Sequence, residues 1–262
     1  METVRRPAVA GMFYPDDPEE LRAQIQSFLA QAIVGGSVPK AIIAPHAGYI
    51  YSGPVAASAY GRLRAGRGII RRVVLLGPSH RVGFRGIAVS AMNAFATPLG
   101  RIPIDKAALE QIRELPCVSF LEQAHAQEHS LEVHLPFLQE VLGDFSLVPL
   151  VVGDASPEQV GMVLEALWDG PETLLVISSD LSHYHDYQTA RQMDSATSQA
   201  IQSLRFEDIG YEDACGRNPV RGLLWAARRR GLLGEIVDLR NSGDTAGSRD
   251  HVVGYGAYVF HE

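Results

Sequence analysis

Short apolar runs alternate along the chain with stretches whose apolar residues have helical spacing. Asp17 followed by Pro18 has the residue types of a helix start. The stripe of Leu21, Ile25 and Leu29 predicts that a helix follows. Buried strands are predicted at residues 41–45, 72–77, 145–152 and 173–179, and further helices at 54–65, 105–115, 157–168, 186–204 and 218–230. This alternation predicts βαβ units and an α/β fold with a central, mostly parallel sheet flanked by helices.

Two regions depart from this alternation. Residues 83–104 contain two short strand-like segments with a Gly and Pro corner, which predicts a strand pair outside the sheet. Residues 234–242 and 251–260 also have strand patterns, and they make the predicted sheet mixed. Because neither a repeat nor a long linker interrupts the sequence, we expect a single domain over residues 1–262.

Composition narrows the classes of partner. The chain has 262 residues, 46% of them hydrophobic, and a net charge of −7 without a basic stripe. We therefore expect no nucleic-acid partner and no anionic-membrane surface. No apolar run reaches the ~18 residues of a membrane helix. The only cysteines, Cys117 and Cys215, are far apart and outside any CxxC motif, which favours a reducing, cytoplasmic location. Cys215 is expected to be a small buried residue, although the helix start that follows it could stabilise a thiolate.

Polar residues follow four of the apolar runs. His46 follows the first run and His80 the second, while Asp180 and His183 follow the fourth. Asp154 follows the third, where it is interpreted as part of a helix cap. In an open parallel sheet, the carboxyl ends of the strands meet at one edge, where ligands bind. Two imidazoles and a carboxylate there would suit Fe(II), and the same ligands would also hold zinc.

A competing pattern occurs at His125, Glu128 and His129, which match the H-x-x-E-H arrangement of inverted zinc proteases. That motif needs one helix to hold both histidines. The local signals instead predict a helix that begins at Ser130 and leave His125 in the preceding loop. We therefore interpret His129 as a residue that lines the crevice.

Several motifs, in order along nearly the whole chain, resemble the Memo family, whose prokaryotic members are called AmmeMemoRadiSam system protein B. They are "PAVAGMFYP" at 7–15, "IIAPHAGYIYSGPVAASAY" at 42–60, "LLGPSH" at 75–80, "EHSLEVHLPFL" at 128–138, "SSDLSHY" at 178–184, "CGRNP" at 215–219 and "NSGDTAG" at 241–247. The family is similar in fold to class III extradiol dioxygenases of the protocatechuate type, whose non-haem iron is held by two histidines and a carboxylate.

The resemblance implies roles for individual residues. His46 and His80 match the histidines that correspond to the dioxygenase iron ligands, and Asp180 and His183 match residues of the same pocket. A cysteine of animal Memo proteins aligns with Thr245, so the neighbouring Asp244 is predicted as the third metal ligand. The expected metal is Fe(II), with copper or zinc as alternatives.

The residues and the resemblance together predict a metal-binding protein that is either a metal-dependent oxidoreductase acting on a small hydroxylated substrate or a metal-binding remnant of one. His183, oriented by Asp180, would transfer protons, and His129 is a second acid or base candidate. The family name also implies AMMECR1-like and radical-SAM partners. The alternative is a non-catalytic module that recognises a peptide or a partner protein in the same crevice. The tyrosines predicted to rim that crevice and contact the substrate are Tyr49, Tyr51 and Tyr184, with Tyr187 nearby.

Overall fold

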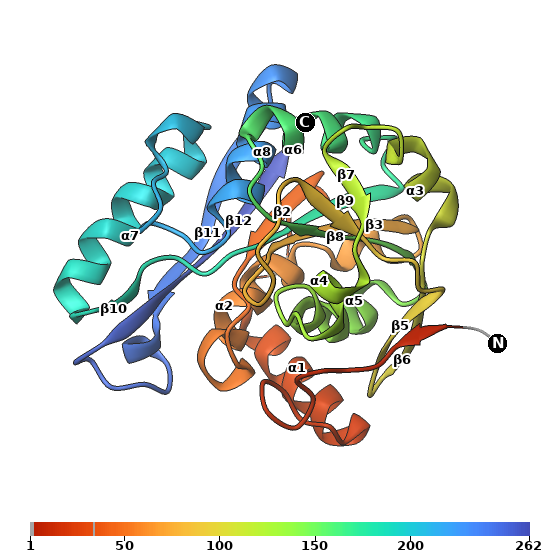
Figure 1. Cartoon of the computed structure of the whole chain (residues 1–262). Coiled ribbons are helices and arrows are strands. Elements are labelled where there is room, and N and C mark those ends of the chain that lie inside the picture. Colours follow the sequence, from red (N-terminus) through yellow and green to blue (C-terminus); the bar gives the residue numbers. More distant parts are fainter. Residues whose placement is uncertain (1–2, 34) are drawn as a thin grey trace.

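A computed structural model describes residues 3–33 and 35–262. Its centre is a mixed sheet with the strand order β10-β12-β2-β9-β3-β8-β4-β7, and β11 pairs with β12 (Figure 1). The four inner strands are parallel: β2 (Ala41–Ala44), β9 (Thr173–Ser178), β3 (Arg72–Pro78) and β8 (Ser146–Val152). Their residues are almost all buried, which explains the continuous apolar runs in the sequence. The predicted mostly parallel, mixed sheet is confirmed.

Antiparallel strands flank this parallel centre. β12 (Val252–His261) is antiparallel to β2, and β4 (Ile87–Val89) is antiparallel to β8. The remaining strands of this sheet are β7 (Val118–Phe120), β10 (His183–His185) and β11 (Leu233–Asn241). A separate three-stranded sheet consists of β1 (Val4–Arg5), β5 (Ala94–Thr97) and β6 (Gly100–Pro103). The strand pair expected in residues 83–104 is thus divided, because β4 joins the main sheet whereas β5 and β6 form a hairpin elsewhere.

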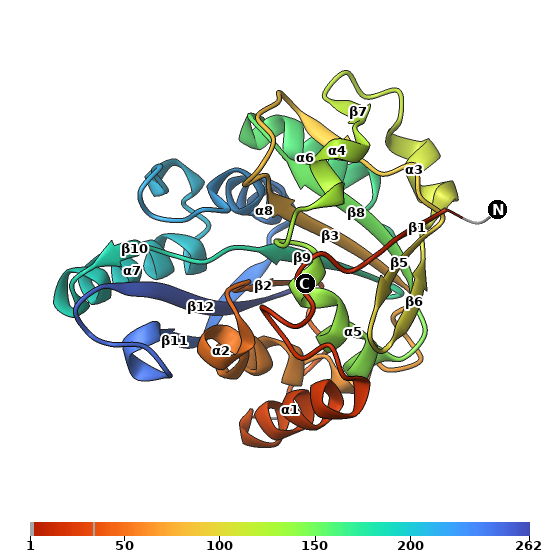
Figure 2. The same ribbon diagram turned by 60° about the horizontal axis from the view of Figure 1, so that its bottom comes forward.

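Helices cover both faces of the main sheet (Figure 2). On one side α2 (Tyr49–Gly61) packs on β2 and β12, with α5 (Leu135–Leu142) and α1 (Pro18–Gln31) against it. On the other side α8 (Arg217–Arg230) packs on β3 and β9 beneath α6 (Pro157–Ala166). α7 (Tyr187–Gln202) lies against β11 and β12. The shorter helices are α3 (Lys106–Ile112), α4 (Glu122–Ala126) and the 3₁₀ turns η1 (Arg64–Gly66), η2 (Glu132–His134), η3 (Phe206–Asp208) and η4 (Ser242–Asp244).

Two helix boundaries differ from the sequence-based prediction. α2 begins at Tyr49, five residues before the predicted start, and Pro54 lies inside it. The early start is possible because the Tyr49 amide donates to the Phe13 carbonyl at 2.7 Å. This hydrogen bond satisfies one of the amides that a helix start leaves unpaired. The helix expected from Ser130 is instead the 3₁₀ turn η2 followed by α5, and His125 lies on α4 rather than in a loop.

Among the described residues, none of the helices combines the length and apolarity that crossing a membrane requires.

Candidate metal centre

Polar side chains meet at the carboxyl ends of the parallel strands, as the sequence pattern predicted. His46 follows β2, His80 follows β3 and Asp180 follows β9. The register of these strands brings their carboxyl ends to one edge of the sheet. A cavity of about 870 Å³ opens there, and its walls include His80, His183 and Cys215.

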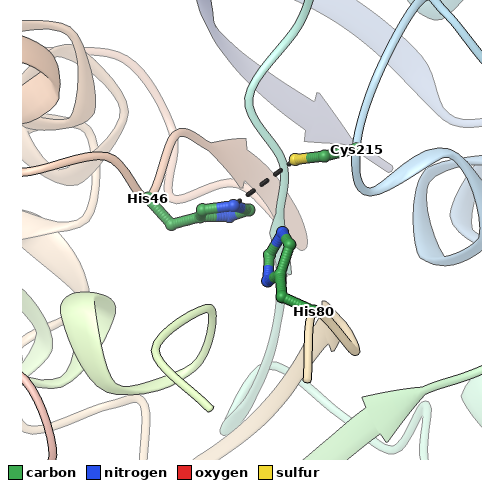
Figure 3. Close-up of side chains that lie close together, drawn as sticks. All are labelled: His46, His80 and Cys215. Atoms are coloured by element: carbon green, nitrogen blue, oxygen red, sulfur yellow. Dashed lines mark hydrogen bonds between the residues drawn. The ribbon is translucent and has the colours of Figure 1, made fainter. Parts of the chain in front are cut away.

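Three of these side chains lie close enough to share one metal ion. His46, His80 and Cys215 each offer a ligand atom, and the three atoms lie within 4.8 Å of one another. Figure 3 shows both imidazoles and the thiol directed toward a common point. The Nε2 atom of His46 lies 3.4 Å from Sγ of Cys215. The centroids of the two imidazole rings are 5.1 Å apart.

His46 is held from two sides. Its backbone amide donates to Oδ1 of Asp180 at 2.7 Å, and its Nδ1 lies 2.6 Å from Oγ of Ser178. The side chain is buried, and this burial, together with the neighbouring imidazoles of His80 and His129, keeps the pKa of His46 well below its usual value. The ring is therefore neutral near pH 7 and retains a nitrogen lone pair that can bind a metal.

Glu128 orients two further imidazoles. Its Oε1 accepts from Nδ1 of His80 at 2.8 Å and lies 3.3 Å from Nδ1 of His129, while its Oε2 accepts from the His80 amide at 2.6 Å. Burial alone would raise the pKa of Glu128, but the hydrogen bonds and charge of His80 and the amide of Ser130 outweigh it and lower the pKa to about 2. Glu128 is therefore a carboxylate that orients imidazoles, an arrangement common behind metal-binding histidines.

Cys215 reaches the centre through a close approach of two backbones. It precedes α8, and the amide of Gly216 donates to Oγ of Ser179 at 3.0 Å. A Cβ at residue 216 would lie 2.4 Å from the Ser178 carbonyl oxygen, so the approach requires a glycine. Sγ of Cys215 accepts from the Asp180 amide at 3.3 Å. Burial, followed by the Asp180 charge, raises the pKa of the Cys215 thiol, so the thiol is protonated in the metal-free protein.

Asp180 and His183 lie at the site in different ways. Burial raises the pKa of Asp180 to about 6 against the opposing effect of the His46 amide. His183 lies on β10, half-buried at the cavity wall. No hydrogen bond joins the two side chains in the part of the chain that the structure describes, although their charges interact. The structure therefore assigns to Asp180 the positioning of His46, and not the predicted orientation of His183.

The predicted third ligand, Asp244, is not brought to this cluster. Its Oδ1 accepts from the Tyr187 hydroxyl at 2.6 Å, and its Oδ2 accepts from the Asn241 amide at 3.1 Å as part of the capping box of η4. The Thr245 hydroxyl donates to the Ser242 carbonyl. Among the described residues, Cys215 instead offers a ligand atom within 4.8 Å of ligand atoms of both imidazoles.

The three predicted substrate-contacting tyrosines have different surroundings. Tyr184 is 73% exposed and lines the cavity, and Tyr51 is 36% exposed on α2. Tyr49, in contrast, is 1% exposed, and its hydroxyl donates to the Val133 carbonyl. Because α2 begins at Tyr49, that ring points into the core and packs on Phe137. The prediction of Tyr49 as a crevice residue is therefore corrected.

The H-x-x-E-H pattern does not form a helical metal motif. α4 ends at Ala126, and Glu128 and His129 lie beyond it. His125 is buried, and its Nε2 lies 3.0 Å from the Ala88 carbonyl oxygen. His129 approaches the centre, with its ring centroid 4.6 Å from that of His80 and 4.8 Å from that of Phe13. The zinc-protease alternative lacks the single helix that it requires.

Sequence reasoning missed three residues of this centre: Cys215, Glu128 as an orienting carboxylate, and Ser178. Cys215 has no metal-site spacing, and its position depends on how α8 packs against β3 and β9. Glu128 and Ser178 had one available signal, because each lies within a few residues of a recognised polar site residue.

Comparisons with known proteins agree with the fold and the motifs. A family model described as "Memo-like protein" matches residues 5–259. A "MEMO1 family protein" of Aquifex aeolicus is 39% identical, over 98% of this chain and 99% of that protein. One from Methanopyrus kandleri is 36% identical, over 98% of each chain. The crystal structure of an uncharacterized Escherichia coli K12 protein is similar to this chain with a TM-score of 0.51 and 16% sequence identity. The similarity covers 82% of this chain and 98% of the Escherichia coli chain, so the two share a fold.

Proposed function

The chain belongs to the Memo family, and we propose that it is a metal-binding protein that holds one transition-metal ion between His46, His80 and Cys215. The observation that carries the proposal is the convergence of two imidazoles and a thiol, from three separate parts of the chain, within 4.8 Å. Glu128 behind His80 supports it, because metal-binding histidines commonly donate their other ring N–H to a carboxylate.

The donor set suits such an ion chemically. His46 is neutral, because burial lowers its pKa, and its Nε2 faces Cys215. The thiol of Cys215 is protonated without a metal, because burial and Asp180 raise its pKa. A bound cation would reverse that preference, since a coordinating thiol loses its proton. Thiolate and imidazole ligands suit copper and zinc, and imidazole also suits iron. The thiol therefore favours copper and zinc, the two alternatives to the expected Fe(II).

We further propose that the site acts as a metal-dependent oxidoreductase on a small hydroxylated molecule bound in the adjacent cavity. The bound metal would supply Lewis acidity or a redox couple. Burial, followed by the neighbouring His80, lowers the pKa of His129 to about 4, so its ring is neutral near pH 7 and can accept a proton from a substrate hydroxyl. His183, on the cavity wall, is a second proton carrier, and Tyr184 beside it offers a hydroxyl and a ring to the substrate.

Metal binding is tested directly on the purified, metal-free protein. Under anaerobic conditions, the protein is titrated with Cu(I), Zn(II) or Fe(II) in competition with a chelator of known affinity, at one fixed pH. We expect one ion per chain for at least one of these metals. His46→Ala, His80→Ala and Cys215→Ser should each lose most of the affinity, because each removes a direct metal bond.

Cys117→Ser is the matched control, because Cys117 is the other cysteine and its thiol contacts the Gln159 carbonyl instead of the imidazoles. That variant should keep the affinity of the original chain. The proposal is wrong if no metal binds stoichiometrically, or if Cys215→Ser and Cys117→Ser bind equally well.

A further inference from the structure

Ser178 lies beneath the metal centre and makes two short hydrogen bonds. It is the last residue of β9 and is fully buried. Its Oγ lies 2.6 Å from Nδ1 of His46 and 2.6 Å from the backbone carbonyl oxygen of Ser130. Both distances are at the short end for hydrogen bonds, so a proton must lie on each line between the atoms.

The position of each proton follows from the chemistry of the partners. A carbonyl oxygen carries no hydrogen, so the single hydroxyl proton of Ser178 is donated to Ser130. The Ser178 oxygen then faces His46 with a lone pair, and Nδ1 of His46 must carry the hydrogen. If the hydroxyl pointed at Nδ1 instead, two oxygen atoms would face each other at 2.6 Å without a proton, and a buried carbonyl would be unpaired.

We propose that Ser178 is a positioning residue that fixes His46 in the Nδ1–H tautomer and leaves the Nε2 lone pair free. In a neutral imidazole only one nitrogen carries hydrogen, so Nε2 is the acceptor. Nε2 is also the atom that lies 3.4 Å from Sγ of Cys215. The hydrogen-bond assignment stands on its own, whereas its consequence for metal binding rests on the proposed function.

His80 obtains the same tautomer by a different means. Its Nδ1 faces Oε1 of Glu128, which is an ionised acceptor and strengthens the hydrogen bond. His46 is oriented by a neutral hydroxyl that is itself fixed by a backbone carbonyl. The Asp180 carboxylate lies 3.9 Å from Nε2 of His46, beyond hydrogen-bond distance, so the neutral Ser178 hydroxyl and not that carboxylate sets the tautomer of this buried imidazole.

The test measures the tautomers in the metal-free protein by long-range ¹H–¹⁵N correlation spectra with ¹⁵N-labelled histidine. Single-histidine variants assign the resonances. We expect His46 and His80 both to have protonated Nδ1 and unprotonated Nε2 at neutral pH. In Ser178→Ala the His46 tautomer should shift or become mixed, while that of His80 stays unchanged. The metal affinity of Ser178→Ala should fall about 10- to 100-fold, the usual effect of removing such a partner.

Ser198→Ala is the control, because Ser198, on α7, is also buried and pairs with the hydroxyl of Tyr258 on β12 instead of an imidazole. It should leave both the His46 tautomer and the affinity unchanged. A protonated Nε2 on His46 in the original chain overturns the inference, and so does an unchanged His46 tautomer in Ser178→Ala. A chain with the expected tautomers that takes up no metal refutes the proposed function and leaves the assignment of Ser178 intact.

Discussion

His134 makes the stability of the fold depend on pH below neutrality. It lies on η2, 1% exposed, and its Nδ1 lies 2.7 Å from the Tyr60 hydroxyl. Burial, followed by the neighbouring His129, lowers the pKa of His134 from 6.5 to about 3. Because the folded-state pKa is lower than the unfolded-state value, the unfolded chain binds the proton more readily. The contribution of neutral His134 to the free energy of unfolding is therefore complete above about pH 6.5 and is lost as the pH falls toward 3.

The size of the effect follows from this difference. Within that interval, each pH unit costs about 1.4 kcal/mol for one histidine that stays neutral in the folded state. Between pH 7 and pH 5 the loss attributable to His134 is about 2 kcal/mol. This is a large fraction of the 5–15 kcal/mol that typically separates a folded domain from its unfolded state.

The assay compares urea unfolding of the original chain and His134→Gln at pH 7, 6 and 5. Glutamine does not titrate, and its carbonyl can still accept from Tyr60. We expect the difference in unfolding free energy between the two proteins to change by about 2 kcal/mol in favour of the variant between pH 7 and pH 5. His251→Gln, which removes an exposed imidazole, is the control. Parallel pH curves for the original chain and His134→Gln would refute the reasoning.

Three further predictions concern other contacts. Glu132→Ala should destabilise the fold by about 3–5 kcal/mol in urea unfolding, because Arg5 is left buried without its counterion. Adding Arg5→Met to this variant should recover part of the loss, and a loss below about 1 kcal/mol for Glu132→Ala would contradict the reasoning. Asp244→Asn should leave metal affinity unchanged in the chelator competition, since its oxygens bond elsewhere, and a loss like that of His46→Ala would restore Asp244 as a ligand. Gly254→Ala should lower the melting temperature, because its Cβ would lie 2.1 Å from the Asp194 carboxylate, and unaltered melting would show that Asp194 can move aside.

The sequence was informative where local pattern and strand geometry act together. An apolar run that ends in a histidine locates His46 and His80 at strand ends, and parallel pairing then brings the two to the same edge. The same reasoning placed Asp180 beside them, and the hydrogen bond that its carboxylate accepts from the His46 amide is consistent with that position.

The sequence was uninformative where a position depends on packing between distant segments. Cys215 enters the centre because Gly216 allows α8 to approach β9, and neither spacing nor residue type reveals that contact. Asp244 was predicted from an aligned position in relatives, but its oxygens are used by the local capping box and by Tyr187. Tyr49 was placed at the crevice because the start of α2 was predicted too late.

The three candidate ligand atoms come from positions 46, 80 and 215, and they meet only when the parallel strands and α8 are in place. An unfolded chain therefore has no equivalent site. By mass action, a ligand that binds only the folded form stabilises it by about 2.7 kcal/mol at a free concentration one hundred times its Kd. If the proposed ion binds, that concentration would lower the unfolded fraction about 100-fold, and scarcity of the metal in the cell would return that fraction of chains to proteolysis.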